Sequence, residues 1–191
     1  EGLYGKELTF GWLGVLGQEW TSVPYNYEDD QKYDFENAAS EVRIDSVWTG
    51  LYNAIANANK LLKELEGKEN LFSGDNYSII KGEVLALRAY LHFDLLRIFG
   101  ASCAVGMERI AIPYVTEYAP TIFPQEKVGD FVGKVLKDLQ DAANCMENDP
   151  ILTGRTVSEI DDNGYLMNRQ VHLNYYAVKG LMARVYLYKG D

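Results

Sequence analysis

The stretch from Asn76 to Gly100, NYSIIKGEVLALRAYLHFDLLRIFG, restricts the possible folds more than any other part of the chain. It is long enough for about seven helical turns, contains no proline and ends at a glycine, which suits a helix C-terminus. Its apolar side chains form two rows at helical spacing: Tyr77, Ile80, Val84, Leu87, Leu91, Leu95 and Ile98 in one, and Ala86, Ala89, Tyr90, Phe93 and Leu96 in the other. A helix that is apolar on two sides needs neighbours on both, so we expect other helices to cover it. Its charged residues are expected to face solvent in a strip or to pair at helix junctions: Lys81, Glu83, Arg88, Asp94 and Arg97.

Three further segments repeat apolar residues every three or four positions, which predicts helices over residues 44–66, 124–146 and 172–189. Asp149-Pro150 is expected to close the second of these. Residues 5–20 have the same spacing but are interrupted by glycines, so we expect a short helix that depends on packing.

The remaining segments lack a helical period. Residues 21–37 are polar and rich in aromatic rings, and they predict a long loop of the kind that is often functional. Residues 101–123 contain two prolines and predict an extended connection. Asn163-Gly164, between β-branched residues, predicts a small β-hairpin within residues 156–168.

Composition excludes several classes of protein. The formal net charge of -10 argues against binding to a phosphate backbone, so we expect no nucleic-acid partner. No run of about twenty apolar residues is present, so no segment is expected to span a bilayer. The chain starts at Glu1 without a signal sequence, which indicates either that a signal was removed or that the chain is a cut piece. Cys103 and Cys145 do not make a disulfide framework and are expected to be free thiols, although one bridge stays possible.

An internal repeat suggests how the helices are arranged. LALRAYLHF around Arg88 and LMARVYLYK around Arg184 match in the order of their small, basic, aromatic and aliphatic residues, at an offset of 184 − 88 = 96 residues. Helix pairs that cannot bury their own apolar faces stack on one another, as in tetratricopeptide-like repeats. The predicted fold is therefore mainly α, with two or more helix pairs, long loops and the small hairpin. The two arginines, together with Arg97, are expected to bind carbonyls between helices.

The candidate catalytic residues favour a protein that is not an enzyme. His92 lies within the long helix and is expected to be structural, and His172 is expected to be a cap or a surface residue. Neither has cysteine or carboxylate neighbours at metal-ligand spacing, and no glycine-rich phosphate loop follows a strand, so neither metal nor cofactor is expected. The acid pairs Asp29-Asp30 and Asp161-Asp162 could in principle serve glycoside hydrolysis, but adjacent acids in polar loops are usually solvated.

Four blocks of the sequence resemble a known family: WTGLYNAIANANKLL (48–62), GEVLALRAYLHFDLLRIFG (82–100), DLQDA (138–142) and NYYAVKGLMARVYLYKGD (174–191). Together with Pro113, and in this order, they resemble the SusD/RagB-like nutrient-binding lipoproteins of Bacteroidetes. The resemblance implies tetratricopeptide-like helices that dock on a TonB-dependent outer-membrane transporter, and a glycan site on the exposed face. It implies location at the outer membrane, at the cell surface, with a lipid anchor that would precede Glu1. The chain is similar to the N-terminal portion, and the family's C-terminal half would be absent.

The resemblance also gives expected boundaries. Residues 1–43 would hold an N-terminal helix and the aromatic loop, residues 44–100 the first helix pair, 101–123 a connection and 124–191 the second pair.

Sugar binding requires flat apolar faces with polar groups at their edges, and the loop supplies both. The candidate ligand-binding residues are Trp20, Tyr25, Tyr27, Asp29, Asp30 and Tyr33. The alternative is that these rings only fix the loop to the helices. A second class of function stays open as well, a helical-repeat scaffold that binds peptide or protein partners along its helices. Exposed aromatics at the loop would favour glycan, and a groove along the helices would favour peptide.

Overall fold

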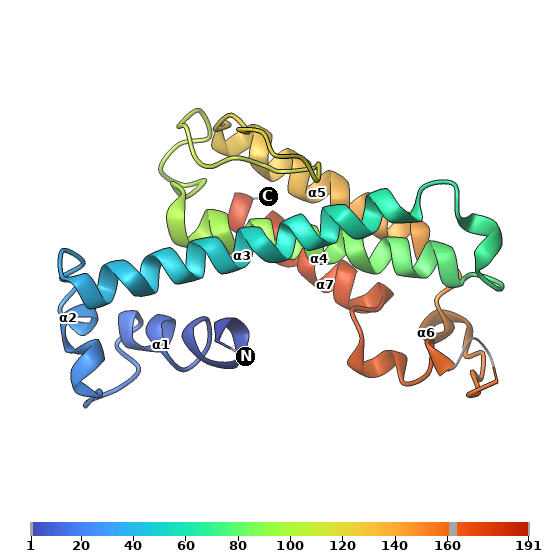
Figure 1. The fold of residues 1–191 in the computed structure, drawn as a ribbon, viewed down its shortest axis with the longest axis horizontal. Coiled ribbons are helices and arrows are strands. Elements are labelled where there is room, and N and C mark those ends of the chain that lie inside the picture. Colours follow the sequence, from blue (N-terminus) through green and yellow to red (C-terminus); the bar gives the residue numbers. More distant parts are fainter. Residues whose placement is uncertain (1, 161–163, 191) are drawn as a thin grey trace. The chain divides into compact units, whose positions relative to one another are not determined.

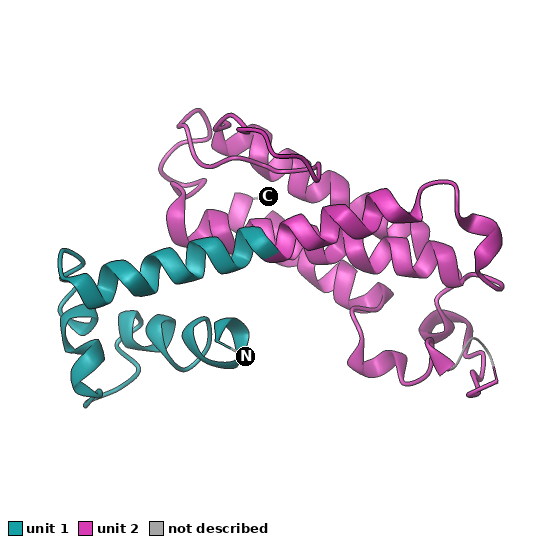
Figure 2. Cartoon of the chain, viewed as in Figure 1, with its two compact units in different colours: residues 1–53 teal, residues 54–191 magenta. Residues whose placement is uncertain are grey.

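The computed structural model describes residues 2–160 and 164–190, which are mainly helical (Figure 1). The chain forms two compact units, unit 1 with residues 1–53 and unit 2 with residues 54–191 (Figure 2). Helix α3 (Ala38–Leu65) begins in unit 1 and ends in unit 2. The predicted mainly α fold class is confirmed.

Unit 1 consists of short helical pieces followed by the first part of α3: η1 (Leu3–Glu7), α1 (Trp12–Leu16), η2 (Tyr25–Tyr27) and α2 (Glu28–Gln31). Glycines limit α1 to five residues, since Gly11 precedes it with a non-helical backbone and Gly17 follows it. The predicted loop of residues 21–37 is more ordered than expected, because η2 and α2 lie within it. Acidic residues occupy the first turn of α2, where the helix dipole favours negative charge.

Helix α3 starts earlier than the predicted residue 44 because a side chain caps it. Asn37 Oδ1 accepts hydrogen bonds from the backbone N–H groups of Ala39 and Ser40, both at 3.0 Å. Such a cap satisfies amide groups that the first helical turn leaves unpaired. Farther along α3, Leu51 and Ile55 are fully buried, as the apolar stripe predicts.

Unit 2 is built on three long helices: α4 (Asn76–Phe99), α5 (Val128–Cys145) and α7 (Tyr175–Lys189). Helix α4 packs mainly on α5, and α5 packs on α7 (Figure 1). The α4 residues Ile79, Ala86, Phe93 and Leu96 are fully buried, which confirms that neighbours cover the long apolar helix. Short helical turns lie in the connections: η3 (Glu69–Leu71), α6 (Pro150–Thr153) and η5 (Arg169–Val171).

Several helices begin or end at other residues than the sequence predicts, because hydrogen bonds outside the helices hold the flanking residues. Helix α5 begins at Val128 rather than Pro124, because the preceding residues pair with an earlier segment through an antiparallel bridge between Ile110 and Lys127. Helix α7 begins after Asn174, whose Oδ1 accepts from Ala177 N at 3.0 Å. Asp149 was expected to close a helix but caps the start of α6, where its Oδ1 accepts from Ile151 N at 3.1 Å.

The predicted β-hairpin of residues 156–168 is not supported. The described residues on either side, 156–160 and 164–168, form turns and irregular structure, and Asp161, Asp162 and Asn163 lie outside the described residues. Gly164 and Asn168 both have positive φ, and Met167 N donates to Gly164 O at 2.9 Å. These left-handed positions turn the chain within a few residues, which leaves no room for a strand after the glycine.

Candidate functional site

Unit 1 contains a hollow of about 370 Å³ with mainly aromatic and aliphatic walls. We call it the aromatic hollow, and its apolar lining residues are Phe10, Val15, Trp20, Val23, Pro24 and Tyr27. Lys6 and Ser22 add polar groups at its wall. Phe10 is 75% exposed and Trp20 is 43% exposed, so two large rings at the hollow are open to solvent.

Local contacts fix the Trp20 ring. Its Nε1–H donates to Phe10 O at 3.0 Å, and its backbone carbonyl accepts from Gln31 Nε2 at 3.0 Å. A Cβ on Gly14 would lie 2.9 Å from Trp20 Nε1, so the close approach of the indole to α1 requires glycine there. The ring is therefore held in place before any ligand binds, which lowers the entropy cost of binding.

Tyr27 forms the inner wall of the hollow and is almost buried. Its hydroxyl contacts Glu7 Oε1 at 2.9 Å, and the Arg43 guanidinium lies 4.1 Å from the centre of its ring. Lys6 Nζ is 3.0 Å from Glu7, and hydrogen bonding with Glu7 and Tyr27 raises the pKa of Lys6. Tyr27 thus joins the hollow to a charged cluster beneath it.

Asp30 lies in that cluster and has no exposed surface. Its Oδ1 accepts from Trp12 Nε1 at 3.1 Å and from Ser40 Oγ at 2.9 Å, and its Oδ2 pairs with Arg43. A buried carboxylate needs such partners to offset its desolvation. Asp30 therefore stabilises the loop against α1 and α3 from inside unit 1.

The other predicted site residues lie outside the lining of the hollow. Tyr25 is 87% exposed and Tyr33 is 55% exposed, and the Tyr33 hydroxyl donates to Leu16 O at 2.9 Å. Asp29 is half-buried, with a carboxylate oxygen 4.0 Å from Lys32 Nζ. The structure thus brings Trp20 and Tyr27 together, buries Asp30, and leaves Tyr25, Asp29 and Tyr33 on other parts of the surface of unit 1.

Phe10 and Lys6 line the hollow, although the sequence pattern does not indicate them as site residues. Both lie in the glycine-rich segment, whose pattern predicts only a weak helix. The glycines in this segment could have indicated the hollow, because Gly5 and Gly11 also line it. Glycines weaken a helix, but beside an aromatic ring they also leave space for a ligand.

In unit 2, Arg88, Asp138 and Tyr114 form a buried cluster whose members bind one another. The Arg88 guanidinium donates to both carboxylate oxygens of Asp138, at 2.7 and 2.8 Å, and the Tyr114 hydroxyl donates to Asp138 at 2.7 Å. Burial raises the pKa of Tyr114 well above its ordinary value, because its ionised form would be desolvated and close to Asp138. Arg88 was expected to bind carbonyls. It does bind Thr116 O at 3.3 Å, but its main partner is this carboxylate.

His92 has the structural role that the sequence predicts. Its Nδ1 lies 2.9 Å from Arg88 O, and its Nε2 accepts from Val115 N at 2.9 Å. The Nδ1–H tautomer satisfies both bonds. Burial lowers the pKa of His92 to about 3, with the nearby Arg88 charge acting in the same direction. The imidazole is therefore neutral at pH 7.

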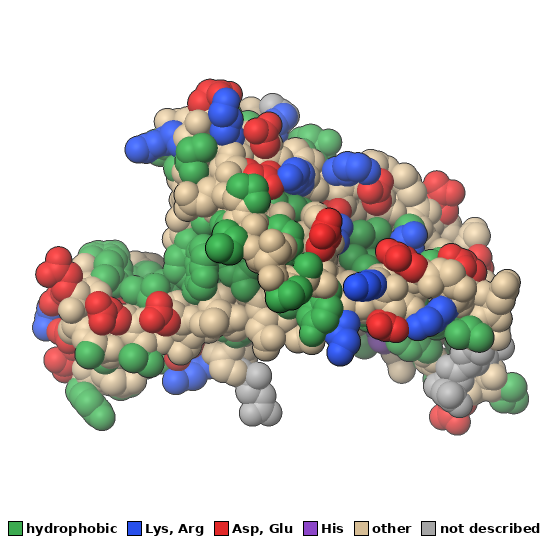
Figure 3. All heavy atoms as spheres, turned by 45° about the horizontal axis from the view of Figure 1, so that its top comes forward, with side chains coloured by type: hydrophobic (Ala, Val, Ile, Leu, Met, Phe, Trp, Pro, Cys, Tyr) green, Lys and Arg blue, Asp and Glu red, His purple; other side chains and the backbone are tan. Residues whose placement is uncertain are grey.

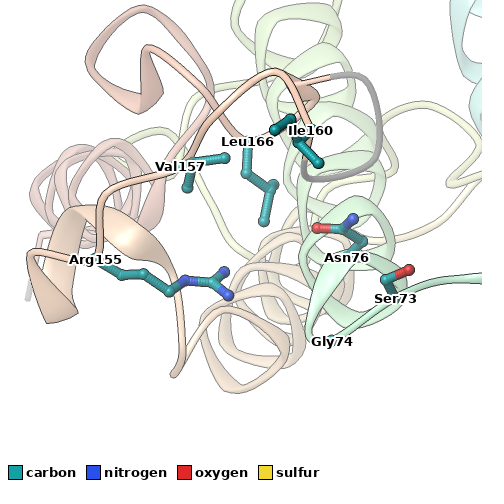
Figure 4. Close-up of a pocket in the computed structure, with 7 residues that line it drawn as sticks. All are labelled: Ser73, Gly74, Asn76, Arg155, Val157, Ile160 and Leu166. Carbon is teal, nitrogen blue, oxygen red and sulfur yellow. The ribbon is translucent and has the colours of Figure 1, made fainter.

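A further hollow of about 280 Å³ lies between the start of α4 and the segment after α6 (Figure 4). Figure 4 shows Val157, Ile160 and Leu166 gathered at one side, with the Arg155 side chain reaching toward α4. Its described lining brings together one guanidinium with apolar, amide and small side chains.

The described residues contain neither a cluster of metal ligands nor a membrane-spanning helix. Within residues 2–160 and 164–190, no group of three or more His, Cys, Asp or Glu residues could hold a metal ion. No helix in this part of the chain combines the length and the hydropathy that a bilayer crossing requires. Cys103 and Cys145 are free thiols.

A protein-family model, SusD-like_3, described as "Starch-binding associating with outer membrane", matches residues 15–187. The chain belongs to this SusD-like family. The match includes Trp20, Tyr27, the helices α3, α4 and α5, and most of α7, and it confirms the resemblance found in the sequence. Among curated proteins, none matches the chain.

Solved structures show the same fold as this SusD-like chain. A putative sugar binding protein from Bacteroides vulgatus ATCC 8482 is 24% identical, with a TM-score of 0.63 over 86% of this chain and 33% of its own. A SusD-like carbohydrate binding protein from the same organism is 18% identical, with a TM-score of 0.68 over 88% and 33%. A laminarin binding SusD-like protein is 22% identical, with a TM-score of 0.54 over 76% and 26%. The chain thus spans about a third or less of the length of these proteins.

Proposed function

We propose that this SusD-like chain is part of a non-enzymatic protein that binds carbohydrate at the aromatic hollow of unit 1. The observation that carries the proposal is the pair of exposed rings, Phe10 and Trp20, at a hollow with polar groups at its wall. Aromatic faces suit the apolar faces of sugar rings, and fixed polar groups give orientation. The sugar-binding and laminarin-binding descriptions of proteins with the same fold support this class of ligand.

We also propose the cellular location and the partner that the family implies. The full-length protein would be anchored by lipid at the outer membrane, on the cell surface, and would deliver oligosaccharide to a TonB-dependent transporter. The family description, which associates starch binding with the outer membrane, supports this location. Among the predicted site residues, Trp20 would contact ligand directly, whereas Tyr27 and Asp30 would hold the loop in shape.

The test is calorimetric titration with maltohexaose and laminarihexaose, using both the full-length parent protein and the 191-residue chain. We expect Trp20→Ala to weaken binding about tenfold, or about 1.4 kcal/mol, because it removes a preorganised ring. Tyr176→Ala is the matched control, since Tyr176 is also an exposed aromatic residue but lies on α7 in unit 2. Unchanged affinity of the full-length Trp20→Ala protein, or equal losses in both variants, would refute the assignment.

A further inference from the structure

The negative charge of the chain is concentrated in unit 1. Residues 1–53 include ten acidic and three basic residues, which gives unit 1 a formal net charge of 3 − 10 = -7. Residues 54–191 include 18 acidic and 15 basic residues, which gives 15 − 18 = -3. Most of the net charge of -10 therefore lies in the unit that contains the aromatic hollow.

The basic residues of unit 1 are already paired with carboxylates of the same unit: Lys6 with Glu7, Lys32 with Asp29, and Arg43 with Asp30. Lys6 lines the hollow, and its Nζ lies 3.0 Å from Glu7 Oε1. A ligand carboxylate at Lys6 would compete with Glu7 and would lie close to that like charge. Lys6 therefore offers little attraction to an anionic ligand.

The charged cluster beneath the hollow is balanced. It contains two cations and two carboxylates around Tyr27: Lys6, Arg43, Glu7 and Asp30. Arg43 Nε lies 3.6 Å from Glu7 Oε2, which links the two ion pairs. Because these four charges sum to zero, other charges of unit 1 decide whether the hollow attracts or repels a charged ligand.

Glu19 adds a carboxylate beside the exposed Trp20 ring. A Cβ on Gly14 would lie 2.9 Å from Trp20 Nε1 and 3.3 Å from Glu19 Oε2, so the indole and the carboxylate approach the same point on α1. Glu19 is exposed, and none of the ion pairs of the described residues in unit 1 includes it. It therefore places a negative charge next to the ring that the proposed ligand would contact.

The polar atoms of the rings at the hollow are used within the protein. Trp20 Nε1–H donates to Phe10 O at 3.0 Å, and the Tyr27 hydroxyl contacts Glu7 Oε1 at 2.9 Å. A ligand thus meets Trp20 and Phe10 mainly as apolar faces, which suit any sugar ring with an apolar face of its own. Charge is then a stronger basis for selection than the pattern of hydroxyl groups.

We propose that the aromatic hollow selects glycans without anionic groups, and that Glu19 is a specificity-determining residue that disfavours anionic sugars such as uronates. This inference rests on the proposed carbohydrate site and adds the class of glycan that the site takes. A neutral glycan is not repelled by unit 1, whereas each carboxylate brought to the hollow is repelled by Glu19 and by the net charge around it.

The first test compares two ligands with the same backbone by calorimetric titration of the full-length parent protein. The ligands are the neutral hexasaccharide that the wild type binds, maltohexaose or laminarihexaose, and the hexauronate made from it by oxidation at C6. At 20 mM salt, we expect the hexauronate to bind about tenfold more weakly. At 300 mM salt, this difference should shrink several-fold, because salt screens the repulsion between exposed charges.

The second test is Glu19→Gln, which removes the charge and keeps the shape of the side chain. At 150 mM salt, where the Debye length is about 8 Å and nearby charges dominate, we expect the ratio of the two affinities to narrow about threefold. Glu36→Gln is the matched control, since Glu36 is also an exposed acid of unit 1 but does not line the hollow, and it should leave the ratio unchanged. Far-UV circular dichroism verifies that both variants are folded.

The outcomes separate this inference from the proposed function. Equal affinity of the wild type for the two ligands, or tighter binding of the hexauronate, would overturn the charge selection and leave carbohydrate binding intact. An unchanged ratio in Glu19→Gln, or an equal change in Glu36→Gln, would refute the role of Glu19. Failure of the wild type to bind either neutral hexasaccharide would refute the proposed function itself.

Discussion

Arg43 and Arg88 perform the same task in different units, since each pairs with a buried carboxylate and also binds the backbone of a loop. Arg43 pairs with Asp30 and donates to Asn26 O at 2.8 Å, and Arg88 pairs with Asp138 and donates to Thr116 O at 3.3 Å. Spacing alone could not predict these pairs, because the partners come from other elements and burial depends on how those elements pack. The sequence indicated Trp20 and Tyr27 as candidate ligand-binding residues of one segment, but it could not separate the exposed ring from the buried one.

His92 should make the protein sensitive to acid. Its pKa is about 3 when folded, against the ordinary value of 6.5, so below pH 6.5 only the unfolded chain binds its proton. Stability is therefore lost as the pH falls from 6.5 toward 3, by about 1.4 kcal/mol per pH unit. His92→Gln keeps an oxygen that can accept from Val115 N but cannot titrate.

The measurement is urea unfolding by far-UV circular dichroism at pH 7, 6, 5 and 4. We expect the stability advantage of the wild type over His92→Gln to shrink by about 3 kcal/mol between pH 7 and pH 4. Carboxylates that titrate in both proteins cancel in this difference. Parallel pH profiles would show that the histidine is not the titrating group.

At the scale of elements, helical periodicity predicted the long helices well, whereas side chains decided their ends. Asn37 and Asn174 cap α3 and α7, and an antiparallel bridge delays the start of α5. The predicted hairpin failed because an Asn-Gly pair signals a turn but does not supply strands to flank it. Phe10 could not be predicted as a lining residue for a related reason. The glycines around it indicate a weak helix, and the same glycines can also leave space for a hollow.

Gly82 should tolerate substitution less well than the helical glycines Gly133 and Gly180. A Cβ there would lie 2.9 Å from the backbone oxygen of Ala142 and 2.9 Å from Met146 Cγ, so α4 and α5 would have to separate. We expect Gly82→Ala to destabilise the protein by about 1–3 kcal/mol, despite the higher helix propensity of alanine.

Gly133 and Gly180 supply matched controls, because a Cβ at either position would have nothing within 4 Å. Alanine at these sites should stabilise the protein by about 0.5–1 kcal/mol in the same urea-unfolding measurement. If Gly82→Ala proved as stable as Gly133→Ala, close packing of α4 on α5 would not require glycine.

At the scale of the whole molecule, charge decides which partners the protein excludes. With 28 acidic and 18 basic residues, the net charge is -10 at pH 7. On the face of the described residues seen in Figure 3, lysine and arginine side chains are interspersed with acidic ones and form no extended basic patch. The surface as a whole therefore carries a net negative charge and repels polyanions.

We expect no binding to polyanions. A heparin column at 50 mM salt should not retain the protein, and a 20-base-pair DNA should show no shift at micromolar protein, since nonspecific DNA binding requires several cations on phosphates. A lysozyme sample on the same column serves as the positive control. Retention that declines with salt would show that an unrecognised basic surface outweighs the net charge.

The tryptophans and the cysteines of the chain lie in different units. Trp12, Trp20 and Trp48 all lie in unit 1, and both thiols lie in unit 2. Cys103 is buried and Cys145 is partly exposed, so a maleimide dye should attach at Cys145 first. Burial raises the pKa of both thiols, which favours labelling at mildly alkaline pH. The native sequence thus provides an indole donor in one unit and an acceptor site in the other, ready for energy-transfer measurements without an introduced residue.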